Sequence, residues 1–175
     1  MLVPSGIEGI NMAWFRARFV AHDIYQLTGE ALERRGFKLL LADLDNTLVP
    51  YKVIKPPPEI VAWKEKLGAA GIVLFLLSNS RKPGRAQKFA EQLGIPYQGH
   101  SGKPKKAGYL RAMERMGCTP AQTVMVGDQI FTDIWGANRA GITSVLVKPI
   151  SWGKNPFRRL RYAIETPFRL LAMKK

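Results

Sequence analysis

Four short polar clusters follow apolar segments of the chain, and they contain the residue types that phosphoryl transfer requires. They are residues 43–47 (DLDNT), 78–80 (SNS), 101–104 (SGKP) and 127–133 (GDQIFTD). Carboxylates can attack phosphorus, transfer protons and bind a hard divalent cation, and a lysine can balance the charge of a phosphoryl group. Singly, each cluster is better explained as a turn or a helix cap. Their occurrence together and in this order predicts one catalytic site.

Alternating apolar strands and amphipathic helices are expected to position these clusters. We expect strands at 38–42, 72–77, 95–98, 123–126 and 143–147, and helices at 58–69, 82–93, 105–116 and 130–140. This alternation predicts an α/β fold with a Rossmann-like core, in which a parallel sheet has helices on both faces. Because ligands bind beyond the carboxyl ends of parallel strands, the clusters should share one pocket.

The chain divides into three predicted regions. Residues 1–37 have apolar residues at roughly helical spacing and predict a helical N-terminal lead-in packed on the core. Residues 38–150 form the catalytic core, and residues 151–175 form a basic amphipathic tail. We see no signal peptide and no apolar run that approaches the ~20 residues needed to span a bilayer. With a single cysteine, Cys118, nothing indicates an oxidising compartment, so we expect a cytoplasmic protein.

The order of the motifs, Asp-x-Asp-x-Thr, Ser, Lys and Gly-Asp-x4-Asp, resembles the haloacid dehalogenase (HAD) superfamily of phosphohydrolases across residues 38–147. The resemblance implies that Asp43 is the nucleophile and forms an aspartyl-phosphate. It implies that Asp45 protonates the leaving oxygen and then activates the water that hydrolyses the intermediate. The residues that it implies for phosphoryl binding are Thr47, Ser78, Asn79 and Lys103.

The same resemblance implies Mg²⁺ as the cofactor. The ion would be held by Asp43, the main-chain carbonyl of Asp45, and Asp128, with Asp133 either as a ligand or as a support for the ligands. Independent chemistry agrees, because a carboxylate that attacks a phosphate dianion faces charge repulsion that a hard cation relieves. Mg²⁺ prefers oxygen ligands and keeps several waters, so that one or two carboxylates suffice to bind it.

The spacing of the motifs leaves no room for a cap domain, since 45–78 can hold a loop, a helix and a strand, and 78–103 a helix and a short strand. The closer resemblance is to the YqeG-type subgroup, which includes mitochondrial phosphatidylglycerophosphate phosphatases. The segments that carry it are residues 41–50 (LADLDNTLVP), 78–80, 103–104 and 127–134. It implies removal of the terminal phosphate of phosphatidylglycerophosphate, although related capless members act on sugar phosphates or polynucleotide ends.

The formal net charge is +14, and half of it lies between Lys148 and Lys175, where eight basic residues accompany one acidic residue. This excess predicts an anionic partner. Four apolar residues of this segment can share one helical face: Phe157, Leu160, Ile164 and Leu171. The tail could therefore lie on an anionic membrane surface, on its inner face, or it could pack on the core and expose a basic face to solvent. We expect Pro167 to end or kink this helix.

Three functions remain open from the sequence. The first is a peripheral membrane phosphatase whose substrate is a phosphorylated lipid headgroup, and the second is a soluble phosphatase for sugar phosphates or nucleic-acid ends. The third is a non-catalytic RNA- or ribosome-binding protein on the same fold, which the positive charge permits. Nucleic acid is disfavoured as a partner, because the chain has no recognisable RNA- or DNA-binding pattern and its acidic set would repel a phosphate backbone unless metal is present.

Overall fold

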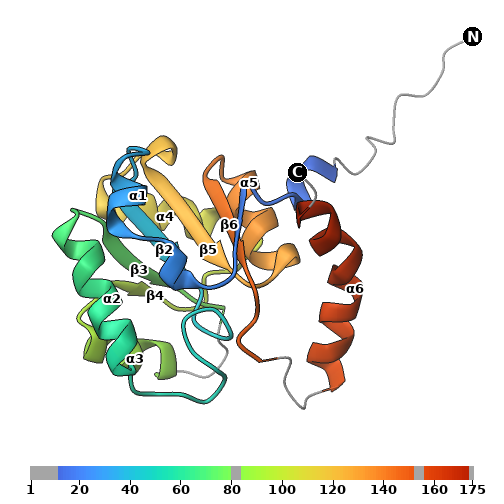
Figure 1. Cartoon of the computed structure of the whole chain (residues 1–175), viewed down its shortest axis with the longest axis horizontal. Helices are drawn as coiled ribbons and strands as arrows, with labels where there is room; N and C mark the ends of the chain where they lie inside the picture. The colour runs from blue at the N-terminus through green and yellow to red at the C-terminus, as the bar shows by residue number, and fades with distance from the viewer. Residues whose placement is uncertain (1–11, 80–83, 152–155, 174–175) are drawn as a thin grey trace, which may run out of the picture.

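The described part of the chain is built around one parallel sheet (Figure 1). It comprises residues 12–79, 84–151 and 156–173 of a computed structural model. The strands are β1 (Phe19–Ala21), β2 (Leu39–Ala42), β3 (Val73–Leu77), β4 (Tyr97–Gln98), β5 (Thr123–Gly127) and β6 (Thr143–Val147). Their order is β1-β6-β5-β2-β3-β4, and all neighbours are parallel, so the carboxyl ends of all six strands point the same way.

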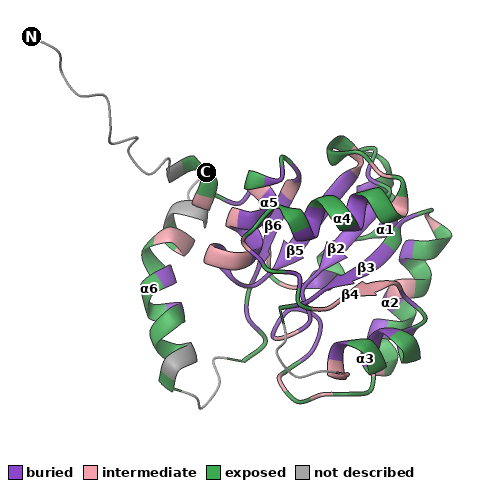
Figure 2. Cartoon of the chain, turned by 180° about the vertical axis from the view of Figure 1, so that it is seen from behind, coloured by how far each residue is buried: buried purple, intermediate pink, exposed green. Residues whose placement is uncertain are grey.

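Helices cover both faces of this sheet. One face carries α1 (Gly29–Glu33), α2 (Pro58–Ala69) and α3 (Arg85–Leu93), and the other carries α4 (Ala107–Met116) and α5 (Trp135–Arg139). Successive residues of β2 alternate between the two cores, with Leu40 and Ala42 on the first face and Leu39 and Leu41 on the second. Figure 2 shows the central strands buried and the outer sides of the helices exposed.

The predicted capless α/β fold is confirmed by this arrangement. Within the described residues, the connection from β2 to β3 contains a loop and α2, and the connection from β3 to β4 contains α3. Neither connection holds an inserted domain in the part of the chain that the structure describes. The carboxyl edge of the sheet is therefore left without a covering domain at these two positions.

The predicted helical lead-in over 1–37 is wrong for part of its length. Residues 1–11 lie outside the described residues, and the remainder contains the 3-10 helices η1 (Met12–Phe15) and η2 (Ile24–Gln26), the short helix α1, and strand β1. β1 extends the sheet at the edge of β6, where Phe19 pairs with Val145. Aromatic and β-branched residues such as Phe19 and Val20 favour strands, and periodicity alone cannot assign so short an apolar run.

The helix predicted at 130–140 forms in two parts. Its first turn, η4 (Ile130–Ile134), is π-helical, and α5 continues from there. The main-chain N–H of Gln129 donates to Asp133 Oδ2 over 3.1 Å. A Cβ atom on Gly127 would lie 2.3 Å from the same carboxylate oxygen, so only glycine leaves room for it. π-helical turns are rare and occur mostly at functional sites, and this one brings Asp133 back over the end of β5.

The C-terminal segment forms α6 (Pro156–Met173), which continues through Pro167 where the sequence predicts an end or a kink. In Figure 1 this helix lies on the opposite side of the molecule from α2 and α3. Tyr162 and Glu165 are buried, whereas Leu160 and Ile164 are exposed. The tail therefore packs on the core through these polar residues and through Phe168, whose ring contacts those of Phe15 and Phe131. Among the described residues, no helix is long and apolar enough to cross a membrane.

Gly136 in α5 provides a test of how tightly α4 and α5 pack. A methyl group on Gly136 would come within 2.4 Å of the hydroxyl oxygen of Tyr109 and 2.6 Å of its buried ring. We predict that Gly136→Ala lowers the free energy of unfolding by about 1–3 kcal/mol, as overpacking usually does. Urea denaturation followed by circular dichroism measures this change.

Gly68→Ala is the matched control for that substitution. Gly68 lies in α2, and a Cβ atom there would meet nothing within 4 Å. Alanine should therefore leave the stability unchanged or raise it by about 0.5–1 kcal/mol through its helix preference. Equal destabilisation by the two substitutions would contradict the close α4–α5 contact.

Candidate active site

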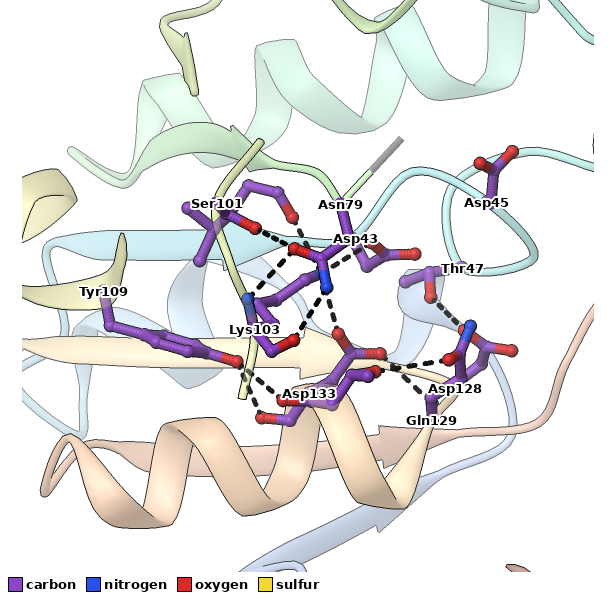
Figure 3. Close-up of polar contacts among 12 residues, drawn as sticks. Asp43, Asp45, Thr47, Asn79, Ser101, Lys103, Tyr109, Asp128, Gln129 and Asp133 are labelled. Carbon is purple, nitrogen blue, oxygen red and sulfur yellow. Dashed lines mark hydrogen bonds and ion pairs between the residues drawn. The ribbon is translucent and has the colours of Figure 1, made fainter. Parts of the chain in front are cut away.

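The predicted site residues gather at the carboxyl ends of β2, β3 and β5. Asp43 follows β2, Ser78 follows β3, and Asp128 follows β5, while Lys103 lies in the connection from β4 to α4. All four are buried. Because β2 lies between β3 and β5, Asp43 is central, and Figure 3 shows Lys103, Asp128 and Asp133 around it.

Three carboxylates form the acidic part of the site. Asp43, Asp128 and Asp133 each offer one oxygen, and these oxygens all lie within 4.8 Å of one another. Burial raises the pKa of Asp128 well above its usual range, and the carboxylates of Asp133 and Asp43 raise it further, although a hydrogen bond from Tyr162 opposes this. Burial also raises the pKa of Asp133 to about 6. This cluster of repelling oxygen donors fits a hard divalent cation, which would relieve the repulsion.

Lys103 supplies the positive charge within the cluster. Its Nζ lies 2.6 Å from Asp43 Oδ1 and 2.8 Å from Asp133 Oδ1, and it donates to the main-chain carbonyl of Leu77 over 2.8 Å. Burial alone would lower the pKa of Lys103, but the carboxylates of Asp133 and Asp43 outweigh it and hold the pKa above its usual range. The ammonium is therefore charged and fixed beside the predicted nucleophile.

Asp133 is held by the protein at both carboxylate oxygens. Oδ1 forms the ion pair with Lys103, and Oδ2 accepts the hydrogen bond from the main-chain N–H of Gln129. The hydroxyl of Tyr109 in α4 donates to the main-chain carbonyls of Thr132 and Asp133 and fixes the turn that carries this side chain. These contacts fit a supporting role for Asp133, while its oxygen also belongs to the cluster that could hold a metal, so both predicted roles stay predictions.

The predicted phosphate-binding residues differ in their surroundings. Thr47 is buried and its hydroxyl donates to Asp128 Oδ1 over 3.1 Å, and Ser78 is buried at the end of β3. The amide of Asn79 instead binds the loop that carries Lys103. Its Oδ1 accepts hydrogen bonds from Ser101 Oγ over 2.7 Å and from the main-chain N–H of Lys103 over 3.0 Å. Its Nδ2 donates to the main-chain carbonyl of Lys103 over 2.8 Å. These bonds hold the Lys103 main chain in place and use one of the two N–H groups of Nδ2.

Asp45 is the predicted catalytic residue that the structure does not bring to the cluster. Figure 3 shows its carboxylate on the loop after β2, directed away from Asp43. Its Oδ1 forms an ion pair of 2.5 Å with Arg85, the first residue of α3. Arg85 also donates from Nε to the carbonyl of Val53 over 3.1 Å. An acid–base role for Asp45 would require its side chain to leave Arg85.

Residues outside the predicted motifs also contribute to the site. Tyr162 in α6 donates from its hydroxyl to Asp128 Oδ2 over 2.5 Å, and the guanidinium of Arg169 donates to the main-chain carbonyl of Asp128. Asn46 Nδ2 donates to the Tyr162 hydroxyl over 2.8 Å. Sequence reasoning marked Asn46 only as part of a resemblance and did not find Arg85, Tyr162 or Arg169, because no local pattern links these positions to the acidic cluster.

Comparison with known proteins identifies the family. The sequence model described as a haloacid dehalogenase-like hydrolase matches residues 7–141, which is most of the chain. The chain belongs to the haloacid dehalogenase-like hydrolase family. It is 33% identical over 143 residues to "Probable phosphatase YqeG" of Bacillus subtilis (strain 168), a match that covers 82% of this chain and 83% of that protein.

Two further similarities place this HAD-family chain among known proteins. It is 34% identical over 156 residues to the chloroplastic/mitochondrial "Phosphatidylglycerophosphate phosphatase 1" of Arabidopsis thaliana, covering 81% of this chain but only 44% of that protein. A solved structure of an uncharacterized protein from Listeria monocytogenes serotype 4b has a TM-score of 0.55 at 20% identity, over 69% of this chain and 85% of that one, which shows the fold alone. The predicted family is thus confirmed, and the chain is an enzyme, an HAD-family phosphatase.

The burial of Asp128 and its repulsion by the neighbouring carboxylates predict a pH-dependent stability for this HAD-family enzyme. Because the pKa of Asp128 is raised in the folded state, the metal-free protein should lose stability as pH rises from the usual aspartate pKa of about 3.9 through the raised value. We predict that Asp128→Asn stabilises the metal-free protein by about 1–2 kcal/mol at pH 7.5. This gain should disappear near pH 3.5, where the wild-type carboxyl is also neutral.

Urea denaturation in EDTA across this pH range measures the difference between the two proteins. Asp23→Asn, at an exposed helix cap, is the matched control and should change stability little at any pH. A metal-free Asp128→Asn protein that is less stable than the wild type at pH 7.5 would show that burial and repulsion of the charged Asp128 carboxylate do not dominate at this cluster.

Proposed function

We propose that this chain is a Mg²⁺-dependent phosphomonoester hydrolase that works through an aspartyl-phosphate on Asp43, and that its substrate is phosphatidylglycerophosphate. The observation that carries the reaction class is the buried Asp43, paired with Lys103 and adjacent to Asp128 at the carboxyl edge of the sheet. The similarity to a phosphatidylglycerophosphate phosphatase over 81% of this chain supports the substrate, which is converted to phosphatidylglycerol.

Each site residue has a separate role in the proposed phosphoryl transfer. Mg²⁺, held by Asp43, Asp128 and the main-chain carbonyl of Asp45, would neutralise negative charge on the phosphoryl oxygens. An Asp43 carboxylate oxygen attacks phosphorus as the bond from phosphorus to the substrate oxygen breaks, and Asp45 gives that oxygen a proton. Lys103 lies 2.6 Å from Asp43 and orients the nucleophile.

Hydrolysis of the intermediate then returns the enzyme to its starting state. Asp45 takes a proton from water, the water oxygen bonds to phosphorus, and the bond between phosphorus and Asp43 breaks to release inorganic phosphate. Ser78, buried beside the cluster, would donate a hydrogen bond to a phosphoryl oxygen, and Thr47 would do the same once its hydroxyl proton turns away from Asp128 Oδ1. Asp45 reaches these positions only after its ion pair with Arg85 opens.

The exposed face of α6 supports contact with a lipid bilayer. Leu160 and Ile164, one helical turn apart, are 59% and 54% exposed, and the exposed Arg159 lies next to Leu160. An apolar stripe bordered by basic residues suits the interface of an anionic membrane. The side chains of Phe157 and Leu171, predicted for the same stripe, lie outside the described residues. We therefore propose peripheral binding to the inner face of a membrane, with α6 as the contact.

The substrate proposal is tested by comparing phosphatidylglycerophosphate with small sugar phosphates at fixed Mg²⁺. We predict that the lipid has the higher kcat/KM and that Asp43→Asn lowers turnover at least about 10³-fold, because it removes the nucleophile. Asp23→Asn is the control and should retain wild-type turnover, since Asp23 is exposed and caps η2. Higher kcat/KM for sugar phosphates would favour the soluble alternative, and RNA binding without turnover would favour the binding protein.

The membrane proposal has a test that does not depend on turnover. We predict that the double substitution Leu160→Gln and Ile164→Gln reduces co-sedimentation with phosphatidylglycerol-containing vesicles about tenfold or more, because it removes the apolar stripe. Hydrolysis of a small soluble phosphate ester should stay unchanged. Val61→Gln with Leu110→Gln, at exposed apolar positions on α2 and α4, is the matched control. Equal sedimentation of all three proteins would refute the role of the stripe.

A further inference from the structure

The buried hydroxyl of Tyr162 lies between two polar groups of the site's loops, one from Asn46 and one from Asp128. It donates to Asp128 Oδ2 over 2.5 Å and accepts from Asn46 Nδ2 over 2.8 Å. Tyr162 is only 2% exposed and belongs to α6, which follows the last strand of the sheet. A carboxylate can only accept hydrogen bonds and the Asn46 amide nitrogen can only donate, so the tyrosine proton must point to Asp128.

Asp128 is restrained from three directions. Thr47 Oγ1 donates to Oδ1 over 3.1 Å, Tyr162 donates to Oδ2, and the guanidinium of Arg169 donates to the main-chain carbonyl. Two of these three donors come from α6. The rotation of the carboxylate and the path of its main chain are thus both fixed by this helix.

The rest of the inner face of α6 holds the loop that follows Asp128. Arg161 donates to Gln129 Oε1 over 2.7 Å, and Glu165 accepts a hydrogen bond from the main-chain N–H of Phe131 over 3.3 Å. Residues 161, 162, 165 and 169 recur at helical spacing, so one continuous face of α6 makes all of these contacts. This face ties α6 to the segment 128–131.

We propose that Tyr162 is a positioning residue for metal binding, which acts by holding the Asp128 carboxylate in the orientation that receives the cation. α6 is then a part of the metal site as well as a surface helix. The inference rests on the proposed function, because it concerns the metal which that function requires. A hydroxyl bound to one carboxylate oxygen leaves lone pairs of both oxygens for a cation, and loss of such supporting contacts typically lowers metal affinity about 10–100-fold.

Tyr162→Phe tests this directly, because it removes the hydroxyl and keeps the ring. The measurement is the Mg²⁺ concentration that gives half of the maximal rise in unfolding temperature of the full chain. We expect this concentration to increase about 10–100-fold in Tyr162→Phe. At saturating Mg²⁺, turnover of a soluble phosphate ester should return to within about threefold of wild type, since the hydroxyl does not touch the phosphoryl group.

Two further variants keep the experiment decisive. Tyr25→Phe loses an exposed hydroxyl far from the site and should bind Mg²⁺ like the wild type. Asn46→Gly removes the donor to Tyr162 and tolerates the left-handed backbone of that position, with φ of 66°, so it should weaken Mg²⁺ binding in the same direction even if Tyr162→Phe does not fold.

The outcomes separate this inference from the function beneath it. Wild-type Mg²⁺ affinity in Tyr162→Phe and Asn46→Gly, with only a lower unfolding temperature in EDTA, would overturn the positioning role and leave the proposed function intact. If the wild type itself shows no Mg²⁺-dependent rise in unfolding temperature, the metal site fails and the inference fails with it.

Discussion

The burial of three carboxylates at one edge of the sheet is the constraint on which the rest of the site depends. Removing an ionised carboxylate from water costs several kcal/mol unless a cation or hydrogen-bond donors compensate. Lys103 compensates in part, and its ammonium is therefore fixed by Asp43, Asp133 and the carbonyl of Leu77. The lysine loop is fixed in turn by the amide of Asn79. One lysine cannot balance three acids, and a divalent cation bound by these oxygens would relieve the remaining repulsion.

Because the carboxyl edge carries no cap in the described connections, positioning within the site must come from its own loops and helices. The loop after β2 illustrates the consequence. Its first carboxylate, Asp43, is locked by Lys103, whereas its second, Asp45, is drawn outward by Arg85. A carboxylate paired with Arg85 cannot give a proton to an oxygen leaving from phosphorus at Asp43. In the proposed mechanism, Asp43 is thus already in place and Asp45 is not, and substrate binding would supply the free energy that separates Asp45 from Arg85.

The features that the sequence predicted depend on neighbouring residues, whereas the features that it missed depend on contacts between residues far apart in the chain. Apolar runs such as Leu39–Ala42 define the parallel strands, and the polar residue after each run lies at the carboxyl edge because the topology leaves no other place. The acidic cluster and Lys103 follow from this rule. β1 was not predicted because three residues are too few to show a hydrophobic period. It forms a strand because it pairs with β6 at the edge of the sheet. Arg85 and Tyr162 were missed because their partners lie 40 and 34 residues away.

The sequence pattern could not predict which face of α6 packs on the core, for a different reason. A helical wheel separates the apolar face from the polar face, and the usual expectation is that the apolar face packs inward. Here the inward face is mostly polar, with Phe168 as an apolar exception. The segment 128–131 presents a main-chain carbonyl, a main-chain N–H and a carboxylate that need partners, and Arg169, Glu165 and Tyr162 supply them. The apolar face is left outward as a result. Removing the whole tail would therefore delete the supports of Asp128 together with the proposed membrane contact, so only substitutions on one face can separate the two roles.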